Sequence, residues 1–473
     1  MSEARTERGY TMVRARKTVC VQGLGFVGAA MAVAVAGVTD KSGEPLYNVC
    51  GIDLPTVEGT RRIDALNAGR FPFETTDAKL VAATTKVATR GNLWATSDPS
   101  ELGEADVVVS DVNLDVQYDE EGEPFLDLSM YRSAVASIGE HVKPGALVLV
   151  ETTVPPGTCE KVVVPIVDQA LAERGLPPGS VMVAHSYERV MPGEHYLDSI
   201  VNYWRVYSGI TEKAANACRD FLETVVNTQD YPLTRLRGTT ASETAKVLEN
   251  SYRATTIAFI DEWSRFAEAA GVDLYEVVDA VRMRPTHSNM RTPGFGVGGY
   301  CLTKDPYFAF LAAKDLWAFE GMDFPFSTAA VRTNNASPLR VLDMVREGLG
   351  GSLAGRRVLL CGVSYRQDVG DTRHSPSEVF AKKALAEGAI LTCTDPLVER
   401  WEELGLEVAS EASAEGFDAV VFAVPHRQYR DIDVASWLGG ARPFVLDAFD
   451  ALTAGQRDAL AEAGCSVKCI GRG

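Results

Sequence analysis

The chain has 473 residues, of which 46% are hydrophobic, 23% charged and 8% aromatic, an ordinary globular composition with enough apolar material for several cores. At about 100–200 residues per domain, this length predicts about three domains. The formal net charge of −18 at pH 7 and the lack of an apolar run near the roughly 20 residues that span a bilayer argue against nucleic-acid partners and against a membrane protein.

The N-terminus and the cysteines favour a cytoplasmic protein. Residues 1–17 are polar and rich in arginine, without the apolar segment of a signal peptide. The nine cysteines are an odd number with no C-x-x-C pair, and only six histidines occur. We therefore expect neither a disulfide framework nor a metal site. A reducing compartment is the natural setting, with most thiols buried as inert core residues.

The first part of the chain alternates predicted strands and helices. Short apolar runs are typical of buried strands, and helical patterns, such as residues 26–36 and 130–141, lie between them. This alternation predicts βαβ units and a parallel, doubly wound sheet. The predicted strands are residues 18–22, 48–53, 106–111 and 146–151.

A long helical segment then breaks the alternation. Residues 239–270 contain almost no glycine or proline and are followed by Gly271, a residue that favours the end of a helix. Helical patterns continue over residues 305–314 and 328–347, and the glycines of residues 348–355 indicate a domain boundary. The middle of the chain is therefore predicted to be helical.

Strand and helix patterns alternate again after this boundary. A helix is predicted over residues 377–387, and strands over residues 357–364, 389–395, 419–424 and 444–447. The fold class is therefore α/β, with two doubly wound domains joined by a central helical domain. We place the domains at residues 1–235, 236–347 and 348–473.

The turn between the first strand and helix, Gly23 to Gly28, matches the G-x-G-x-x-G pattern of Rossmann-like domains. Gly23 permits the tight turn, Gly25 lets the backbone approach a pyrophosphate, and Gly28 allows close packing. Asp53 ends the next strand, where a carboxylate accepts bonds from ribose hydroxyls and repels a 2′-phosphate, so NAD is favoured over NADP. A turn that only packs the helix is the alternative. The residues expected to bind NAD are Gly23, Gly25, Phe26, Val27, Gly28 and Asp53.

The stretch from Arg291 to Pro306 contains four glycines before Cys301 and a helical run after it. A thiolate is stabilised in such a loop beside a helix N-terminus. Burial as a small hydrophobe is the usual state of a single cysteine, but this context favours a nucleophile. Asp305, four residues later, is placed to orient a water or a basic group.

Two further clusters supply groups that such a nucleophile needs. Lys246 and Asn250 are four residues apart on the long predicted helix, so they share one face. Both are suited to stabilising an oxyanion, although a solvated helix face is the alternative. Glu188 and Arg189 lie in a loop bounded by proline and glycine after an apolar strand, where Glu188 is a candidate general base.

On the basis of these stretches, the sequence resembles the UDP-glucose/GDP-mannose dehydrogenase family from Val19 to about Asp447. The resemblance rests on five motifs in the family's order. They are Glu151-Thr-Thr-Val-Pro-Pro-Gly-Thr158, Ser186-Tyr-Glu-Arg189, Lys246-x-x-x-Asn250, Gly298-Gly-x-Cys-x-x-Lys-Asp305 and Asp371-x-Arg-x-Ser-Pro376.

The resemblance implies a four-electron oxidation of a UDP-sugar C6 alcohol to the carboxylate, with two NAD+ used in turn. Cys301 would add to the intermediate aldehyde, and Lys246 and Asn250 would hold the oxyanion. Asp305, Glu188 and Thr153 would position water or act as a base. The substrate-binding residues that it implies are Glu188, Arg189, Lys246, Asn250, Phe295, Gly296 and Arg373, and it also implies a homodimer built on a long central helix, residues 239–270.

Three questions stay open at this point. The sugar is glucose or an N-acetylhexosamine, since motifs of both kinds of member occur. A one-step NAD-dependent alcohol or hydroxyacid dehydrogenase, with a structural Cys301, is a rival enzyme. A nucleotide-sugar-binding regulator that has lost turnover is a rival from another class, which the intact Cys301, Lys246, Asn250 and Asp53 argue against.

Overall fold

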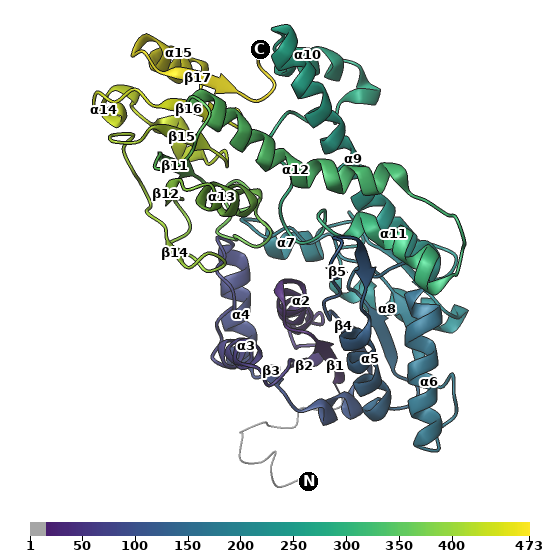
Figure 1. Ribbon diagram of the computed structural model, residues 1–473. Coiled ribbons are helices and arrows are strands. Elements are labelled where there is room, and N and C mark those ends of the chain that lie inside the picture. Colours follow the sequence, from purple (N-terminus) through teal and green to yellow (C-terminus); the bar gives the residue numbers. More distant parts are fainter. Residues whose placement is uncertain (1–15) are drawn as a thin grey trace. The chain divides into compact units, whose positions relative to one another are not determined.

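The computed structural model of the chain describes residues 16–473, which form two compact units (Figure 1). Unit 1 contains residues 16–247 and 308–322. Unit 2 contains residues 248–307 and 323–473. The helical middle of the chain is thus divided between the units, and the predicted ranges of the three domains stay predictions.

The expected absence of a signal peptide concerns residues 1–17, most of which lie outside the described residues. Between residues 16 and 473, no helix is both long enough and apolar enough to cross a membrane.

Unit 1 is built on an eight-stranded sheet in which all neighbours are parallel except β8 and β9. Its central strands are fully buried, which agrees with their unbroken apolar runs. In sheet order, the strands are β10 (Thr234–Arg235), β9 (Val206–Gly209), β8 (Met182–His185), β7 (Leu147–Val150), β4 (Val107–Ser110), β1 (Lys17–Gln22), β2 (Tyr47–Ile52) and β3 (Leu93–Thr96).

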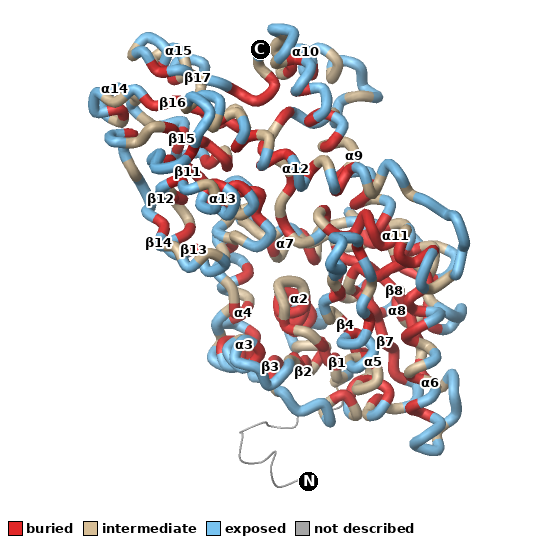
Figure 2. The backbone as a smooth tube through the Cα atoms, viewed as in Figure 1, coloured by how far each residue is buried: buried red, intermediate tan, exposed pale blue. Residues whose placement is uncertain are grey.

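Helices cover this sheet, and β5 (Val116–Tyr118) and β6 (Pro124–Leu126) form a separate hairpin. The first helix, α2, consists of small and apolar residues and is buried over most of its length, as Figure 2 shows. The helices of unit 1 are α2 (Phe26–Gly37), α3 (Val57–Asn67), α4 (Ala78–Arg90), α5 (Ser129–His141), α6 (Val164–Glu173), α7 (Tyr196–Val201), α8 (Glu212–Val225) and α11 (Phe308–Leu311).

Unit 2 contains a five-stranded parallel sheet and a two-stranded hairpin, β13 (Arg400–Trp401) and β14 (Leu406–Glu407). In sheet order, its strands are β12 (Ile390–Thr394), β11 (Arg357–Cys361), β15 (Ala419–Phe422), β16 (Phe444–Asp447) and β17 (Ser466–Cys469). Its helices are α10 (Leu274–Arg282), α12 (Pro325–Gly348), α13 (Pro376–Ala386), α14 (Val434–Leu438) and α15 (Ala454–Glu462), together with most of α9 (Thr239–Ala270), which begins in unit 1.

The predicted α/β class with two Rossmann-like sheets and a helical middle is confirmed. The helix predicted over residues 305–314 is instead divided into three short pieces. A 3₁₀ turn, η4 (Asp305–Tyr307), leads into α11, and a π-helical turn, η5 (Ala312–Leu316), follows it. Pro306 lies in the first turn of the predicted helix, where proline is tolerated, so its missing N–H does not by itself explain the division.

Candidate active site

The three glycines of the turn between β1 and α2 have different surroundings. A Cβ on Gly23, whose φ is +92°, would lie 2.8 Å from the Asp111 carbonyl oxygen, and one on Gly28 would lie 1.9 Å from the Gly23 oxygen. A Cβ on Gly25 would meet no atom within 4 Å. Gly25 also precedes the first turn of α2. The open backbone at the N-terminus of this helix is a suitable cradle for a diphosphate.

Asp53 directly follows β2, as predicted. Its Oδ2 lies 3.1 Å from Nε of Arg62, and its Oδ1 accepts the N–H of Leu54 at 2.8 Å. The carboxylate is therefore held in place at the edge of the sheet next to the glycine turn. Together, the open Gly25 and this oriented carboxylate fit the diphosphate and the ribose of NAD.

Phe26 and Val27 form the first turn of α2. The Phe26 ring stacks on Phe73 with ring centroids 3.9 Å apart, and its backbone oxygen accepts the Tyr196 hydroxyl at 2.6 Å. These contacts fix the beginning of the helix against its neighbours. Both residues stand where a diphosphate at the helix N-terminus would meet backbone N–H groups.

Thr153 is buried in the loop that follows β7. A turn two residues later leads into a π-helical turn, η2 (Cys159–Val163), and α6. Glu243, on the second turn of α9, accepts the backbone N–H of Gly157 at 2.5 Å and of Cys159 at 2.8 Å. Burial raises the pKa of this carboxyl. Glu243 was not among the predicted residues, although its position three residues before Lys246, on the same side of the helix, was a usable signal.

Lys246 and Glu188 meet in unit 1. The Lys246 Nζ donates to the backbone oxygen of Glu188 at 2.8 Å and lies 3.5 Å from its Oε1. Both side chains are buried, so the alternative of a solvated lysine is wrong. Arg189, the next residue, donates to the Trp204 backbone oxygen at 2.7 Å. The loop that carries Glu188 is therefore attached to α9 through Lys246.

Asn250 and Asp305 meet in unit 2. The Asn250 Nδ2 donates to the Asp305 Oδ2 at 2.6 Å, and the Lys304 Nζ donates to Oδ1 at 2.8 Å. All three side chains are buried. Asp305 is thus fixed by an amide and a cation, and the expected contact with a basic group is made by its own neighbour in the sequence. Lys304 lies within the Gly298–Asp305 motif, but the sequence pattern predicted no role for it.

Cys301 is exposed, whereas the eight other cysteines are buried. Its backbone oxygen accepts the N–H of Asp305 at 2.9 Å, which links the thiol loop to the buried carboxylate. The preceding glycines pack closely on the loop between β11 and α13. A Cβ on Gly298 would lie 2.6 Å from Cδ of Pro376, and the Gly299 N–H donates to the His374 oxygen at 3.3 Å. These glycines therefore also serve packing within unit 2.

The three remaining predicted residues, Phe295, Gly296 and Arg373, differ in their surroundings. Phe295 is buried and packs on Phe380, with ring centroids 5.9 Å apart. Gly296 has a φ of +111°, and a Cβ on it would lie 2.9 Å from a backbone oxygen of α12. Arg373 is exposed and paired with Asp371 at 2.7 Å. Among these three, Arg373 offers a charged side chain to solvent.

The structure thus brings the predicted residues together in separate sets. Lys246 with Glu188 belongs to unit 1, as do Thr153 and the coenzyme turn, whereas Asn250, Asp305 and Cys301 belong to unit 2. Lys246 and Asn250 are one turn apart on α9. The roles assigned to these residues stay predictions.

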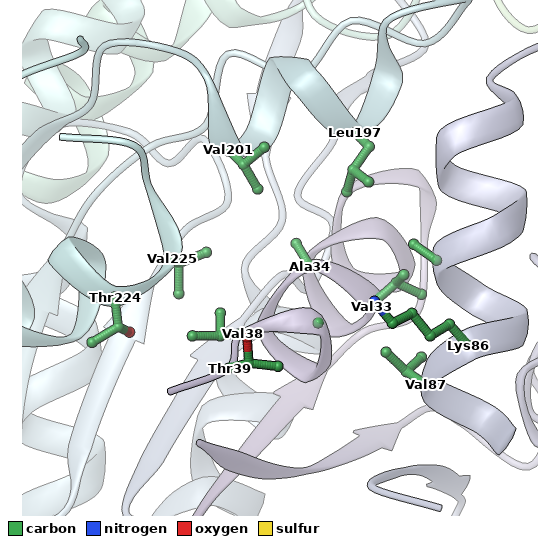
Figure 3. A pocket seen from close by; sticks show the side chains of 12 residues that line it. Val33, Ala34, Val38, Thr39, Lys86, Val87, Leu197, Val201, Thr224 and Val225 are labelled. Carbon is green, nitrogen blue, oxygen red and sulfur yellow. The ribbon is translucent and has the colours of Figure 1, made fainter. Parts of the chain in front are cut away.

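A cavity of about 390 Å³ in unit 1 contains none of them (Figure 3). It lies near the C-terminal end of α2, whereas the glycine turn precedes the N-terminal end of that helix. Its lining is mostly aliphatic, with Val33, Val87, Leu197 and Val201 among the side chains, and Lys86 at one side. This lining offers few polar groups for a nucleotide.

Comparison with known proteins finds relatives that match this chain over most of their length. The chain is 29% identical over 420 residues to a UDP-N-acetyl-D-mannosamine dehydrogenase of Methanocaldococcus jannaschii, covering 88% of this chain and 87% of that protein. It is also 29% identical over 438 residues to an NDP-N-acetyl-D-galactosaminuronic acid dehydrogenase of Ralstonia nicotianae, covering 88% and 92%. A solved UDP-D-ManNAc dehydrogenase from Pyrococcus horikoshii is 27% identical, with a TM-score of 0.81 over 96% of this chain and 99% of that one.

Sequence models of three domains of one family match the chain in order. Residues 17–226 match its NAD-binding domain, residues 240–336 its central domain and residues 359–454 its UDP-binding domain. The glycine turn, Lys246 with Asn250 and Cys301, and Arg373 fall in the first, second and third match, respectively. The chain is therefore an NAD-dependent oxidoreductase, and it belongs to the UDP-glucose/GDP-mannose dehydrogenase family.

Proposed function

We propose that the chain oxidises the C6 alcohol of a UDP-N-acetylhexosamine to the carboxylate, with Cys301 as the nucleophile. The observation that carries the proposal is the exposure of Cys301, alone among nine cysteines, on a loop tied to the buried Asp305. The choice of an N-acetylhexosamine over glucose rests on relatives named for N-acetylmannosamine and N-acetylgalactosaminuronic acid.

Different residues of the chain have different roles in the oxidation and in the hydrolysis that follows it. NAD+, when bound, accepts the hydride that leaves the sugar carbon in each oxidation. The Cys301 thiolate adds to the C6 aldehyde, so the aldehyde stays attached until the second oxidation has produced a thioester. Lys246 and Asn250 supply donors to the oxyanion. Water then hydrolyses the thioester, with Asp305, Thr153 and Glu188 positioning it or taking up its proton.

The remaining residues bind the two nucleotides. Gly25 and Asp53 hold the diphosphate and ribose of NAD, with Phe26 and Val27 forming the helix start. Arg373 contacts the phosphates of the UDP-sugar, because an exposed guanidinium forms bidentate bonds with phosphate. The backbone at Phe295 and Gly296 lines the sugar, and Arg189 fixes the loop of Glu188.

The test counts NADH released per sugar for a panel of UDP- and GDP-sugars. Two NADH per sugar and a uronic acid product, with the best rate on a UDP-N-acetylhexosamine, are expected. One NADH per sugar would favour the single-step dehydrogenase. Tight UDP-sugar binding without NADH formation would favour a regulator.

The nucleophile is tested with Cys301→Ser, which should abolish acid formation and leave UDP-sugar and NADH binding unchanged. Serine keeps the size of the side chain but lacks a readily formed anion. The buried Cys465→Ala serves as the control and should retain acid formation. Full acid production by Cys301→Ser would refute the covalent mechanism.

We also propose that the chain forms a homodimer through α9. Tyr252, Phe259, Trp263 and Phe266 are spaced to share one face of this helix, and each is about half exposed. Trp263 lies edge-on to both Phe259 and Phe266. A second copy presenting the same stripe would cover it by two-fold symmetry. Single exposed apolar residues are normal on a protein surface, but a contiguous stripe of aromatic residues indicates an interaction site.

The dimer is tested by sedimentation of Trp263→Glu. A charge at the centre of the stripe should convert dimers into monomers, while Glu276→Ala on the neighbouring helix should leave the mass unchanged. A monomeric wild-type protein at micromolar concentration would contradict the proposal.

The compartment that we propose is the cytoplasm. The eight buried cysteines are free thiols, and the proposed mechanism needs Cys301 in its reduced form. Fractionation of cells that express the tagged chain, with recovery in the cytosolic fraction, is the expected result.

A further inference from the structure

Asp111 and Glu151 stand side by side where β4 and β7 end. The parallel register pairs Ser110 with Val150, and the Glu151 N–H donates to the Ser110 oxygen at 3.1 Å. The next residue of each strand is therefore one strand spacing away, about 4.8 Å, with both side chains on the same face of the sheet. The two side-chain carboxyl groups consequently face each other at the edge of the sheet where the strands have their C-terminal ends.

These two carboxyl groups are buried and incompletely bonded. One oxygen of Glu151 accepts a hydrogen bond from the Arg205 guanidinium, and both of those side chains are almost wholly inaccessible. The other oxygen of Glu151 and both oxygens of Asp111 are buried without a hydrogen-bond partner among residues 16–473. Unpaired buried carboxylate oxygens are costly, whereas a proton placed between two of them gives each a partner.

Arg205 is the cation whose charge acts on Asp111, but its hydrogen bond is to Glu151. Three carboxyl groups lie here, Asp111, Glu151 and Glu188, and two cations. Arg205 pairs with Glu151, and Lys246 lies 3.5 Å from Glu188.

The other groups at this edge add no charge. His185, which ends β8, is kept neutral because burial lowers its pKa to about 3. Gln22, at the end of β1, is uncharged. Burial, followed by the negative charge of Glu151, raises the pKa of Asp111 well above its ordinary value. The environment therefore favours a neutral Asp111.

Asp111 also lies directly under the glycine turn. Its N–H donates to the Gln22 oxygen at 2.8 Å, and its Cβ would lie 3.1 Å from a Cβ on Gly28. A negative charge at this position would oppose a diphosphate held at the start of α2. The protonation state of Asp111 therefore bears on how strongly the turn binds an anion.

We propose that Asp111 and Glu151 share a single proton, so that Asp111 is uncharged, and that loss of this proton at high pH weakens the binding of NAD. This inference rests on the coenzyme site proposed above. It makes Asp111 a positioning residue, which acts on the coenzyme through the charge under the glycine turn.

The shared proton is tested first without any coenzyme, by infrared spectroscopy of the full chain at pH 8. The carbonyl band of a protonated carboxylic acid should be present in the wild type and reduced in Asp111→Asn. In Glu151→Gln, Asp111 can ionise beside Arg205, so this variant should also show the loss if Asp111→Asn does not fold. Asp106→Asn, at the opposite end of β4, is the control and should keep the band. An unchanged band in both pair variants would overturn the proposal.

The effect on the coenzyme is tested by NADH fluorescence titration from pH 6 to pH 10. The dissociation constant of the wild type should rise on the order of tenfold as the shared proton is lost, and that of Asp111→Asn should stay constant. A constant value in the wild type would overturn the role in binding. Absence of NADH binding at every pH would instead refute the coenzyme site, while the infrared result would still decide whether the proton is shared.

Discussion

Parallel strands of both sheets are followed by buried carboxylates, but these carboxylates differ in their hydrogen bonds. In unit 2, Asp395 follows β12 and accepts the backbone N–H groups of Val363 and Ser364 at 2.9 and 3.1 Å. In unit 1, neither oxygen of Asp111 accepts any hydrogen bond from the described part of the chain. The same place in the architecture therefore holds a carboxylate that fastens a loop in one unit and one that is left without donors in the other.

The difference teaches how to separate structural from functional carboxylates. Burial acts to raise the pKa of Asp395, but the hydrogen bond and charge of His426, with backbone N–H groups, lower it overall. Asp447, which ends β16, also accepts the N–H groups of Ala451 and Leu452 at 2.8 and 3.0 Å, although burial raises its pKa overall. A carboxylate whose oxygens accept backbone N–H groups of nearby loops stabilises the fold, whereas one without such donors is a candidate for a functional role.

The largest expected effect is on Asp395. Asp395→Ala leaves the N–H groups of Val363 and Ser364 buried without an acceptor and removes the carboxylate bonded to His426, so the free energy of unfolding should fall by about 3 kcal/mol. Urea unfolding, followed by the fluorescence of the tryptophans, measures the change. Asp458→Ala, at an exposed carboxylate of α15, should change the unfolding free energy by less than about 0.5 kcal/mol. An equal effect of the two substitutions would remove the contrast between loop-fastening and surface carboxylates.

The turns after the first strand of each sheet differ as well. Residues 23–25 connect β1 to α2, whereas residues 362–375 connect β11 to α13. The short turn, residues 23–25, leaves its backbone open at the N-terminus of α2. The long turn, residues 362–375, contains the exposed Arg373. One unit therefore offers an anion mainly backbone groups, and the other offers a side chain.

This contrast predicts that one substitution weakens only NADH binding and the other weakens only UDP binding. Gly25→Val fills the open space above the turn and should weaken NADH binding by about tenfold, about 1.4 kcal/mol, without changing UDP binding. Arg373→Ala removes a charge-assisted bond worth about 1.5 kcal/mol and should weaken UDP binding alone. Calorimetric titration of each variant with both nucleotides measures the four values. A loss of both affinities in either variant would break the distinction between the two turns.

Much of this architecture was available from the sequence because its signals are local. The helix predicted over residues 239–270 matches α9, since Gly271 ends a long run without helix breakers. The strand predicted over residues 18–22 differs from β1 by one residue. The G-x-G-x-x-G pattern also placed the glycine turn correctly, because Gly23 and Gly28 answer local backbone requirements.

Contacts between distant segments were not available in the same way. Residues 308–322 join unit 1, where the Trp317 indole donates to the Pro156 oxygen at 2.8 Å and lies against Gly157. No periodic pattern connects two positions so far apart in the chain. The proximity of Asp111 and Glu151 could have been predicted from the sequence. Both residues end predicted strands, and parallel strands end at one edge of a sheet.

Per pH unit, the smallest expected effect is the change in stability of Asp111→Asn relative to the wild type. Because the folded protein raises the pKa of Asp111 above its ordinary 3.8, it holds a proton that the unfolded chain releases. The stability of the wild type therefore falls as pH rises from the ordinary value toward the raised one. Asparagine has no proton to lose, so the variant should gain about 1 kcal/mol relative to the wild type for each pH unit in this range.

Urea unfolding of both proteins at several pH values measures this gain, and Asp106→Asn gives the opposite sign. Although burial acts to raise it, Lys143 and the Thr18 N–H lower the pKa of Asp106 overall. The stability that this carboxylate contributes is complete above the ordinary pKa and is lost as pH falls through the lowered one, so the deficit of Asp106→Asn should shrink in acid. If Asp111→Asn followed the wild type in parallel at every pH, Asp111 would be ionised in the folded protein. The carboxylate under the glycine turn would then be an ordinary acid like those that fasten the loops of unit 2.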